Sequence, residues 1–208
     1  MSTSGIAMDK QQELSKLESE LATDESLPLR ESNLVFGEGN VDAKVVFVGE
    51  APGFHENQLK RPFVGRAGQL LDKFIQEIGW KREDVYITNI VKRRPPENRD
   101  PIPEEIEAYK PYLARQLTIL NPTVIATLGR FSMNYYLPEA KITRDQGKVF
   151  RVGSTCVVPL FHPAAALRST GVLEQFRESF RKLPAIIAKC EKLPPVEIKR
   201  PPPQAKLF

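Results

Sequence analysis

The chain has 208 residues and a mass of 23.5 kDa, with 41% hydrophobic residues, 27% charged residues and a formal charge of +4. This length suits one domain that buries about 70% of the surface of its unfolded chain. No apolar run approaches the roughly 20 residues that a membrane-spanning helix needs, and the first residues lack the pattern of a secretory signal, so we expect a cytoplasmic protein. Two cysteines and two histidines are too few for a disulfide framework, a four-thiolate site or a histidine-rich metal site.

The charge is unevenly distributed along the chain. Residues 1–35 contain seven acidic and three basic residues, a formal charge of −4, so the remaining residues carry +8. A basic body suits a polyanionic partner, although many ordinary proteins have a similar balance.

The first half of the chain alternates between helical and strand patterns. Residues 9–22 are rich in helix-forming residues, with leucines at helical spacing, and predict a short helix. Residues 45–48 form a continuous apolar run, which is typical of a strand buried on both faces of a parallel sheet. An amphipathic helix is predicted over 65–79, where it ends at a glycine, and a second strand over 85–88.

The second half continues the alternation. Residues 103–120 predict a helix, because a proline and two acidic residues occupy its first turn. A third strand over 123–128 is followed by a short helix over 130–137, and a fourth strand over 156–161 is followed by one or two helices over 173–190. This alternation predicts an open α/β domain with a mainly parallel sheet.

The last 18 residues, 191–208, differ from the rest because they contain five prolines, which exclude a regular helix or central strand. We therefore expect a domain over residues 1–190, including an N-terminal helical segment over 1–30, and an extended proline-rich tail over 191–208.

Polar residues follow three of the predicted strands. They are Glu50 in the sequence GEAPG, Asn89 in the sequence TN, and His162 in the sequence HPA. Each alone is explained by a tight turn, a loop cap or a satisfied histidine. Together they lie at one edge of the sheet, where open α/β sheets bind ligands, and predict a functional site.

Seven motifs follow one another along the chain. They are FGEGN (36–40), VGEAPG (48–53), RPFVGRAG (61–68), ITNIVK (87–92), RPP (94–96), NR (98–99) and FHPA (161–164). In this order they resemble the family-4 uracil-DNA glycosylases, a branch of the uracil-DNA glycosylase superfamily, over about residues 20–187. The resemblance implies a three-layer α/β/α sandwich around a central four-stranded parallel sheet.

The resemblance also implies a reaction, hydrolysis of the bond between uracil N1 and deoxyribose C1′ after the base has left the DNA stack. Phe63 matches the aromatic residue that stacks on the flipped uracil. Asn89 matches the residue that reads the edge of uracil, because an amide can accept from N3–H and donate to O4. Cytosine presents the opposite pattern and would leave these groups unpaired.

Departure of the base leaves negative charge on uracil O2. His162 matches the histidine that donates a hydrogen bond to this oxygen. In relatives with the first motif Gly-Gln-Asp-Pro-Tyr an aspartate orients the attacking water, but the matching position is Ala51, in the uracil-binding loop. Glu50 and Glu56 remain as candidates. We favour Glu56 for the water, with Glu50 orienting the loop or helping to bind uracil.

Several residues are candidates for contact with DNA. The segment HPAAALRST matches the loop that enters DNA beside the flipped nucleotide, with Leu167 as a wedge and Arg168 as a phosphate contact. A helix start with a solvated arginine would also explain this segment. Lys92 and Arg94 lie in a basic cluster that suits phosphate contact.

The family normally carries a four-iron four-sulfur cluster held by four cysteines. The matching positions hold no cysteine here; they fall at Ala22, Glu25, Arg93 and about Tyr109. Because such clusters need thiolates, we expect no cofactor and no metal. An ion pair between Arg93 and Glu25, and the volume of Tyr109, are candidate structural substitutes.

The chain ends in Gln204-Ala205-Lys206-Leu207-Phe208. This pattern, with Gln204, Leu207 and Phe208 as contacts, resembles short peptides that dock on DNA sliding clamps. It fits the bacterial motif as a pentapeptide and the archaeal motif in truncated form.

Two functions remain open. The first is a monofunctional uracil-DNA glycosylase of base excision repair, acting as a monomer, without a membrane partner, near the nucleoid in a prokaryote. The second is a non-catalytic module that binds uracil or abasic DNA and is delivered by a clamp. A nucleotide-binding α/β protein fits poorly, since no glycine-rich phosphate-binding motif follows the first strand.

Overall fold

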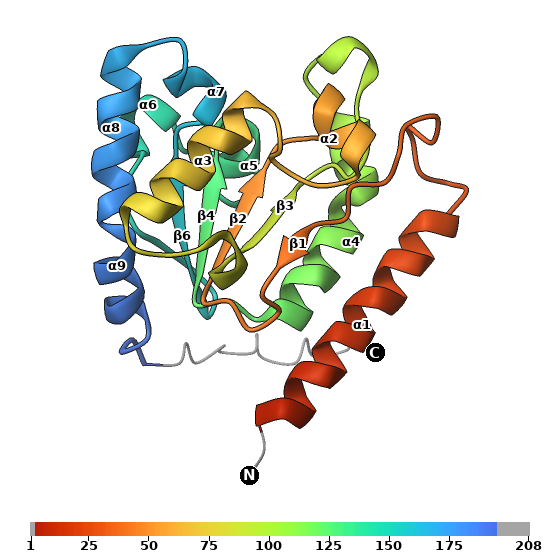
Figure 1. Cartoon of the computed structure of the whole chain (residues 1–208), viewed down its shortest axis with the longest axis horizontal. Coiled ribbons are helices and arrows are strands. Elements are labelled where there is room, and N and C mark those ends of the chain that lie inside the picture. The colour runs from red at the N-terminus through yellow and green to blue at the C-terminus, as the bar shows by residue number, and fades with distance from the viewer. Residues whose placement is uncertain (1–2, 195–208) are drawn as a thin grey trace, which may run out of the picture.

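A computed structural model describes residues 3–194 of the chain, with side chains from residue 9 onward (Figure 1). One sheet of six strands runs through it in the order β1-β3-β2-β4-β6-β5. The strands are β1 (Glu38–Gly39), β2 (Val45–Gly49), β3 (Tyr86–Asn89), β4 (Val124–Leu128), β5 (Phe150–Val152) and β6 (Thr155–Leu160). The inner four strands are parallel, whereas β1 and β5 pair antiparallel at the two edges.

The predicted α/β class is confirmed, and all four predicted strands lie in the sheet. The four inner strands form the central parallel sheet that the resemblance implies, and β1 and β5 add one antiparallel strand at each edge, which was not predicted. These edge strands have two and three residues, too few to show a periodic apolar pattern.

Helices account for most of the remaining described residues. They are α1 (Thr3–Thr23), α2 (Phe54–Leu59), α3 (Arg66–Glu77), α4 (Pro103–Leu120), α5 (Arg130–Tyr136), α6 (Ile142–Asp145), α7 (Pro163–Ala166), α8 (Thr170–Arg181) and α9 (Leu183–Cys190), with short 3-10 turns η1 (Arg82–Asp84) and η2 (Pro96–Asn98). Within residues 3–194, none of the helices combines the length and the apolarity that crossing a bilayer requires.

The helices cover both faces of the sheet, as Figure 1 shows: α3, α8 and α9 lie on one face and α1 and α4 on the other. Strand β2 explains how the sequence encodes this arrangement. Val45 and Phe47 belong to one apolar cluster, and Val46 and Val48 to the other. The uninterrupted apolar run is therefore needed because successive side chains enter two different cores.

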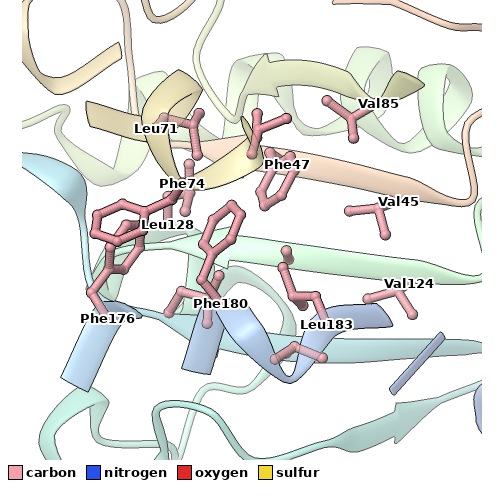
Figure 2. Close-up of a cluster of buried hydrophobic side chains, with 14 of the residues drawn as sticks. Val45, Phe47, Leu71, Phe74, Val85, Val124, Leu128, Phe176, Phe180 and Leu183 are labelled. Carbon is pink, nitrogen blue, oxygen red and sulfur yellow. The ribbon is translucent and has the colours of Figure 1, made fainter. Parts of the chain in front are cut away.

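Phenylalanine rings from β2, α3 and α8 pack together in the core beneath α3 and α8 (Figure 2). Phe47 of β2 stacks on Phe180 of α8 at 5.4 Å between ring centroids, and Phe74 of α3 meets Phe176 of α8 edge-on at 5.1 Å. This packing fixes α3 and α8 against the sheet, and their upper ends carry the loops that contain Phe63 and Leu167.

The opposite core joins α1 to α4. Leu14, Leu17 and Leu21, the leucines whose spacing predicts the first helix, are all buried in the cluster that also contains Tyr109 and Leu113 of α4. The helix begins before the predicted residue 9, at Thr3.

Candidate active site

The carboxyl ends of the parallel strands bring Glu50, Asn89 and His162 to one edge of the sheet. Gly49, the last residue of β2, pairs with Asn89, the last residue of β3. Glu50 directly follows β2, and His162 is the N-cap of α7, two residues after the end of β6. The convergence predicted from the strand pattern is therefore present in the structure.

Asn89 lies in the floor of this site, and its Oδ1 is buried without a hydrogen-bond partner among the described residues. A buried acceptor left unpaired costs free energy unless a ligand supplies the donor. Gly49 makes room for it, since a Cβ on Gly49 would collide with both Asn89 Oδ1 and the ring of Phe63. The side chains of Asn89 and Phe63 can therefore both lie against residue 49 only because it is a glycine.

Phe63 is buried and holds an unusual backbone conformation, with φ at 51°. Three contacts support this strained position. Arg82 donates to the carbonyl oxygens of Pro62 and Phe63 at 2.5 and 3.2 Å, and Gly68 lies so close that a Cβ there would collide with the Phe63 carbonyl group. Such over-determination of a strained residue is typical of a binding site.

His162 is oriented by the start of α7. Its Nδ1 accepts a hydrogen bond from the backbone N–H of Ala164 at 3.1 Å, so in the neutral ring the proton lies on Nε2. Burial lowers the pKa of His162 to about 4, with Glu56 opposing and Arg168 reinforcing this shift. The imidazole is therefore neutral at physiological pH and offers one N–H donor.

The two candidate glutamates have different surroundings. Oε1 of Glu56, in α2, accepts from the backbone N–H groups of Val64 and Gly65 at 2.9 and 2.8 Å, which fixes the loop that carries Phe63. Burial, followed by the charge of Asp100, raises the pKa of Glu50 to about 7, although Arg130 opposes the shift. Ala51, beside Glu50, packs partly buried against the α1–α4 core.

Asp100 and Arg130 near Glu50 did not emerge from the sequence patterns. They form an ion pair at 2.7 Å, and both side chains are exposed. Arg130 had a signal in the sequence, since it follows Gly129 directly at the end of the third predicted strand, at the same edge as Glu50, Asn89 and His162. Asp100 lies in a proline-rich loop, and no feature of the sequence indicated its place near the site.

The candidate DNA contacts fall into two groups. Leu167 and Arg168 are exposed after α7, where a large surface partner can reach them. Arg94 is half-buried: its Nε donates to Asn98 Oδ1 at 2.7 Å, and its guanidinium group lies 5.2 Å from the centre of the Phe54 ring.

The prediction that Lys92 contacts a DNA phosphate is wrong, because its side chain is entirely buried. Its Nζ lies 2.5 Å from both Thr88 Oγ1 and Gln116 Oε1, and 3.2 Å from the carbonyl oxygen of Phe36. Burial lowers its pKa well below 10.5. Lys92 is thus a buried hydrogen-bond donor on the face of the sheet opposite Asn89.

The substitution Lys92→Met tests this buried amine. Because the pKa of Lys92 is lowered in the folded chain, the unfolded chain binds more protons at this residue below pH 10.5. Stability should therefore rise with pH towards 10.5, by at most about 1.4 kcal/mol per pH unit. The variant should lack this contribution. Urea unfolding of both proteins between about pH 8 and 10 measures it, and parallel pH dependences would contradict it.

The four positions that match the family's cluster ligands do not fit an iron–sulfur group. Tyr109 is fully buried and its hydroxyl donates to the carbonyl oxygen of Pro28 at 2.7 Å, while Arg93 Nη1 donates to that of Ser32 at 2.5 Å. The candidate pair of Arg93 with Glu25 is wrong: Glu25 is exposed and lies 3.8 Å from Arg30. No group of three or more metal-ligating side chains occurs in the described part of the chain.

Comparisons with known proteins agree with the site described above. The model of the "Uracil DNA glycosylase superfamily" matches residues 36–184, which include every residue at the carboxyl edge described above. The chain belongs to the uracil-DNA glycosylase superfamily.

Its relatives in this superfamily are similar over most of their length. The chain is 44% identical over 167 residues to the type-4 uracil-DNA glycosylase of Archaeoglobus fulgidus, covering 76% of this chain and 84% of that protein. It is 47% identical to the type-4 enzyme of Thermotoga maritima, with 69% and 76% covered. A type-5 uracil-DNA glycosylase of Pyrobaculum aerophilum is 30% identical, with 71% and 74% covered.

Proposed function

We propose that this chain is a monofunctional uracil-DNA glycosylase, which hydrolyses the bond between uracil N1 and deoxyribose C1′ and leaves an abasic site in DNA. The observation that carries the proposal is the buried, unpartnered Oδ1 of Asn89, which lies with the Phe63 ring beside Gly49. The membership of the superfamily and the type-4 relatives support it.

In this mechanism the flipped uracil stacks on Phe63 and pairs with Asn89. Oδ1 accepts from N3–H and the amide group donates to O4, so uracil supplies the donor that Oδ1 lacks. Cytosine has an acceptor at N3 and a donor at N4. The Oδ1 acceptor of Asn89 would then face an acceptor, and its NH2 group would face a donor. Discrimination follows from this mismatch in a buried site.

The chemical step breaks the N1–C1′ bond while the water oxygen bonds to C1′, and the proton that the water loses is balanced by the proton that the uracil anion takes up. The electron pair leaves with uracil, and its negative charge is stabilised at O2 by the Nε2–H group of His162. A neutral imidazole suffices for this hydrogen bond, in agreement with the lowered pKa of His162. Glu56, anchored through Oε1, orients the water with its second oxygen. Lys92 is buried and bonded, so its amine is unavailable for a covalent step, as a monofunctional enzyme requires.

The carboxyl group of Glu50 gives the reaction a pH dependence. Its pKa is about 7, so raising the pH through 7 converts it to a carboxylate, which stabilises the positive charge that develops on the sugar. The single-turnover rate should rise over this range in the natural chain and become flat in Glu50→Gln. A rate that falls with pH, or an unchanged profile in the variant, would contradict this role.

DNA is the macromolecular substrate in this proposal. Leu167 enters the stack beside the flipped nucleotide, and Arg168 and Arg94 contact phosphates. The enzyme works as a monomer. It has no iron–sulfur cluster, because the four positions that match the family's cluster ligands offer no thiolate. Hydrogen bonds from Arg93 and Tyr109 tie down the segment near residues 28–32 in its place.

The proposal is tested with an oligonucleotide that contains a single uracil, treated with alkali after incubation. Strand cleavage that depends on alkali is expected. Cleavage without alkali would contradict a monofunctional mechanism. Binding of the oligonucleotide without cleavage would replace the enzyme by a non-catalytic uracil-binding module.

The residues predicted to bind a sliding clamp, Gln204, Leu207 and Phe208, lie outside the described residues. We expect deletion of 204–208 to abolish co-precipitation with a sliding clamp and to leave excision from a short oligonucleotide unchanged. Equal co-precipitation by both forms would remove the clamp from the proposal.

A further inference from the structure

An exposed ion pair lies on the rim of the candidate active site. Arg130 Nη2 contacts Asp100 Oδ2 at 2.7 Å, and the two side chains are 63% and 61% exposed. Exposed pairs of this kind add little to the stability of a fold, so one partner can be exchanged at small cost.

The sheet topology places Arg130 between the two ends of the site. β4 lies between β2, which leads to Glu50, and β6, which leads to His162. Gly129, which follows β4, donates its N–H to the carbonyl oxygen of Leu160 at 2.9 Å, and a Cβ on it would lie 3.1 Å from His162 Cβ. Arg130, the next residue and the first of α5, therefore begins at this edge of the sheet, and its guanidinium group lies 4.3 Å from the centre of the Phe131 ring.

Asp100 reaches Arg130 from a loop that is itself anchored. Arg99 binds Glu105 of α4 at 2.6 Å and donates to the carbonyl oxygen of Asp100 at 3.0 Å. The preceding residues Glu97 and Asn98 both have φ values in the left-handed region, 53° and 57°. The loop therefore presents one carboxylate to an arginine that faces the solvent at the mouth of the site.

We infer that Arg130 binds a phosphate of the DNA strand next to the flipped nucleotide, and that Asp100 occupies this position on Arg130 in the DNA-free protein. The inference rests on the proposed function. A phosphate accepts hydrogen bonds from a guanidinium group as well as a carboxylate does. A DNA phosphate can therefore replace Asp100 on Arg130, since other contacts already hold the DNA. Asp100 competes with the phosphate for Arg130. The ion pair of the free protein must break when DNA binds, which lowers the affinity for DNA.

The two partners should consequently have opposite effects on DNA affinity. Arg130→Gln removes the contact, raising Kd by roughly tenfold and reducing the slope of log Kd against log salt by about 0.9. Asp100→Asn removes the competitor and should lower Kd. When Arg130 is already replaced by Gln, Asp100→Asn should increase DNA affinity only by the small amount that the change in net charge brings.

The measurement uses fluorescence anisotropy with a duplex that contains one 2′-fluoro-2′-deoxyuridine, whose glycosidic bond resists hydrolysis. Matched controls come from Arg115 and Glu20, a second exposed ion pair at 2.7 Å that joins α4 to α1 away from the sheet edge. Arg115→Gln and Glu20→Gln make the same changes in net charge. Thermal unfolding verifies that all variants fold.

Larger effects at Arg130 and Asp100 than at the control pair, together with the loss of the Asp100→Asn gain in the double variant, support the inference. Equal effects at the two pairs, or additive effects in the double variant, overturn it. Uracil excision by the unmodified chain is measured separately on an ordinary uracil duplex, so a failure of the proposed function is distinguished from a failure of the phosphate contact.

Discussion

Replacing Asn89 by alanine is expected to lower the single-turnover rate of uracil excision by about a thousandfold. The variant loses both hydrogen bonds that distinguish uracil from cytosine, and the base then rests on Phe63 without a fixed orientation. Because Oδ1 of Asn89 has no partner among the described residues, its removal breaks no hydrogen bond of that oxygen within the protein. The loss should therefore appear in catalysis far more than in folding.

The matched measurement is binding to a duplex without uracil. Asn89 lies in the buried floor of the site, so its replacement should leave this affinity unchanged within about twofold. A rate close to that of the unmodified protein would show that Asn89 does not read the base. Equal losses in excision and in uracil-free binding would point to a general structural defect.

Replacing His162 by alanine is expected to lower the excision rate by 10² to 10³, about the effect of removing one donor to a developing oxyanion. The loss should appear in kcat rather than in KM, since the hydrogen bond strengthens as charge develops on uracil O2. The variant also loses the acceptor for the Ala164 N–H group, which costs about 1 kcal/mol of stability. His162→Gln, which retains an N–H donor, should recover part of the rate.

His55 provides the control for this experiment. It is the other histidine of the chain, it is exposed in α2, and His55→Ala should change the rate by less than about twofold. The pH profile gives an independent check. With a pKa of about 4, His162 stays neutral above pH 5, so no loss of activity from its protonation is expected there. Full activity in His162→Ala would exclude the proposed oxyanion contact.

The positions of Glu50, Asn89 and His162 could be predicted from the sequence because each follows a short apolar run. Such runs mark buried parallel strands, and the carboxyl ends of parallel strands meet at one edge. Neither step needs knowledge of long-range contacts. The same local logic located the four inner strands, the leucines of α1 and the boundaries of α4.

Features that depend on distant residues could not be predicted. Lys92 follows a strand and precedes two arginines, so its pattern indicated a basic surface. Its burial depends on Phe36 and Gln116, which lie 56 and 24 residues away and accept its hydrogen bonds. The contact between Asp100 and Arg130 likewise joins residues 30 positions apart, one in a loop and the other at the start of α5.

Ala51 stands where relatives with the Gly-Gln-Asp-Pro-Tyr motif have the aspartate that orients the water, so another acceptor is needed. Glu56 lies in a helix that the sequence patterns did not predict, and its contacts with Val64 and Gly65 link it to the loop of Phe63. The residue that we favour for orienting the water therefore also fixes the aromatic platform. Substitution of Glu56 should for this reason affect both uracil binding and the chemical step.

We propose above that this chain excises uracil without an iron–sulfur cluster. One measurement tests it directly: iron, sulfide and single-turnover uracil excision are determined on the same preparation, purified under anaerobic conditions. We expect iron and sulfide contents near zero together with complete, alkali-dependent strand cleavage. Stoichiometric iron and sulfide in the active protein, or a preparation without iron that binds uracil-containing DNA but does not cleave it, would contradict it.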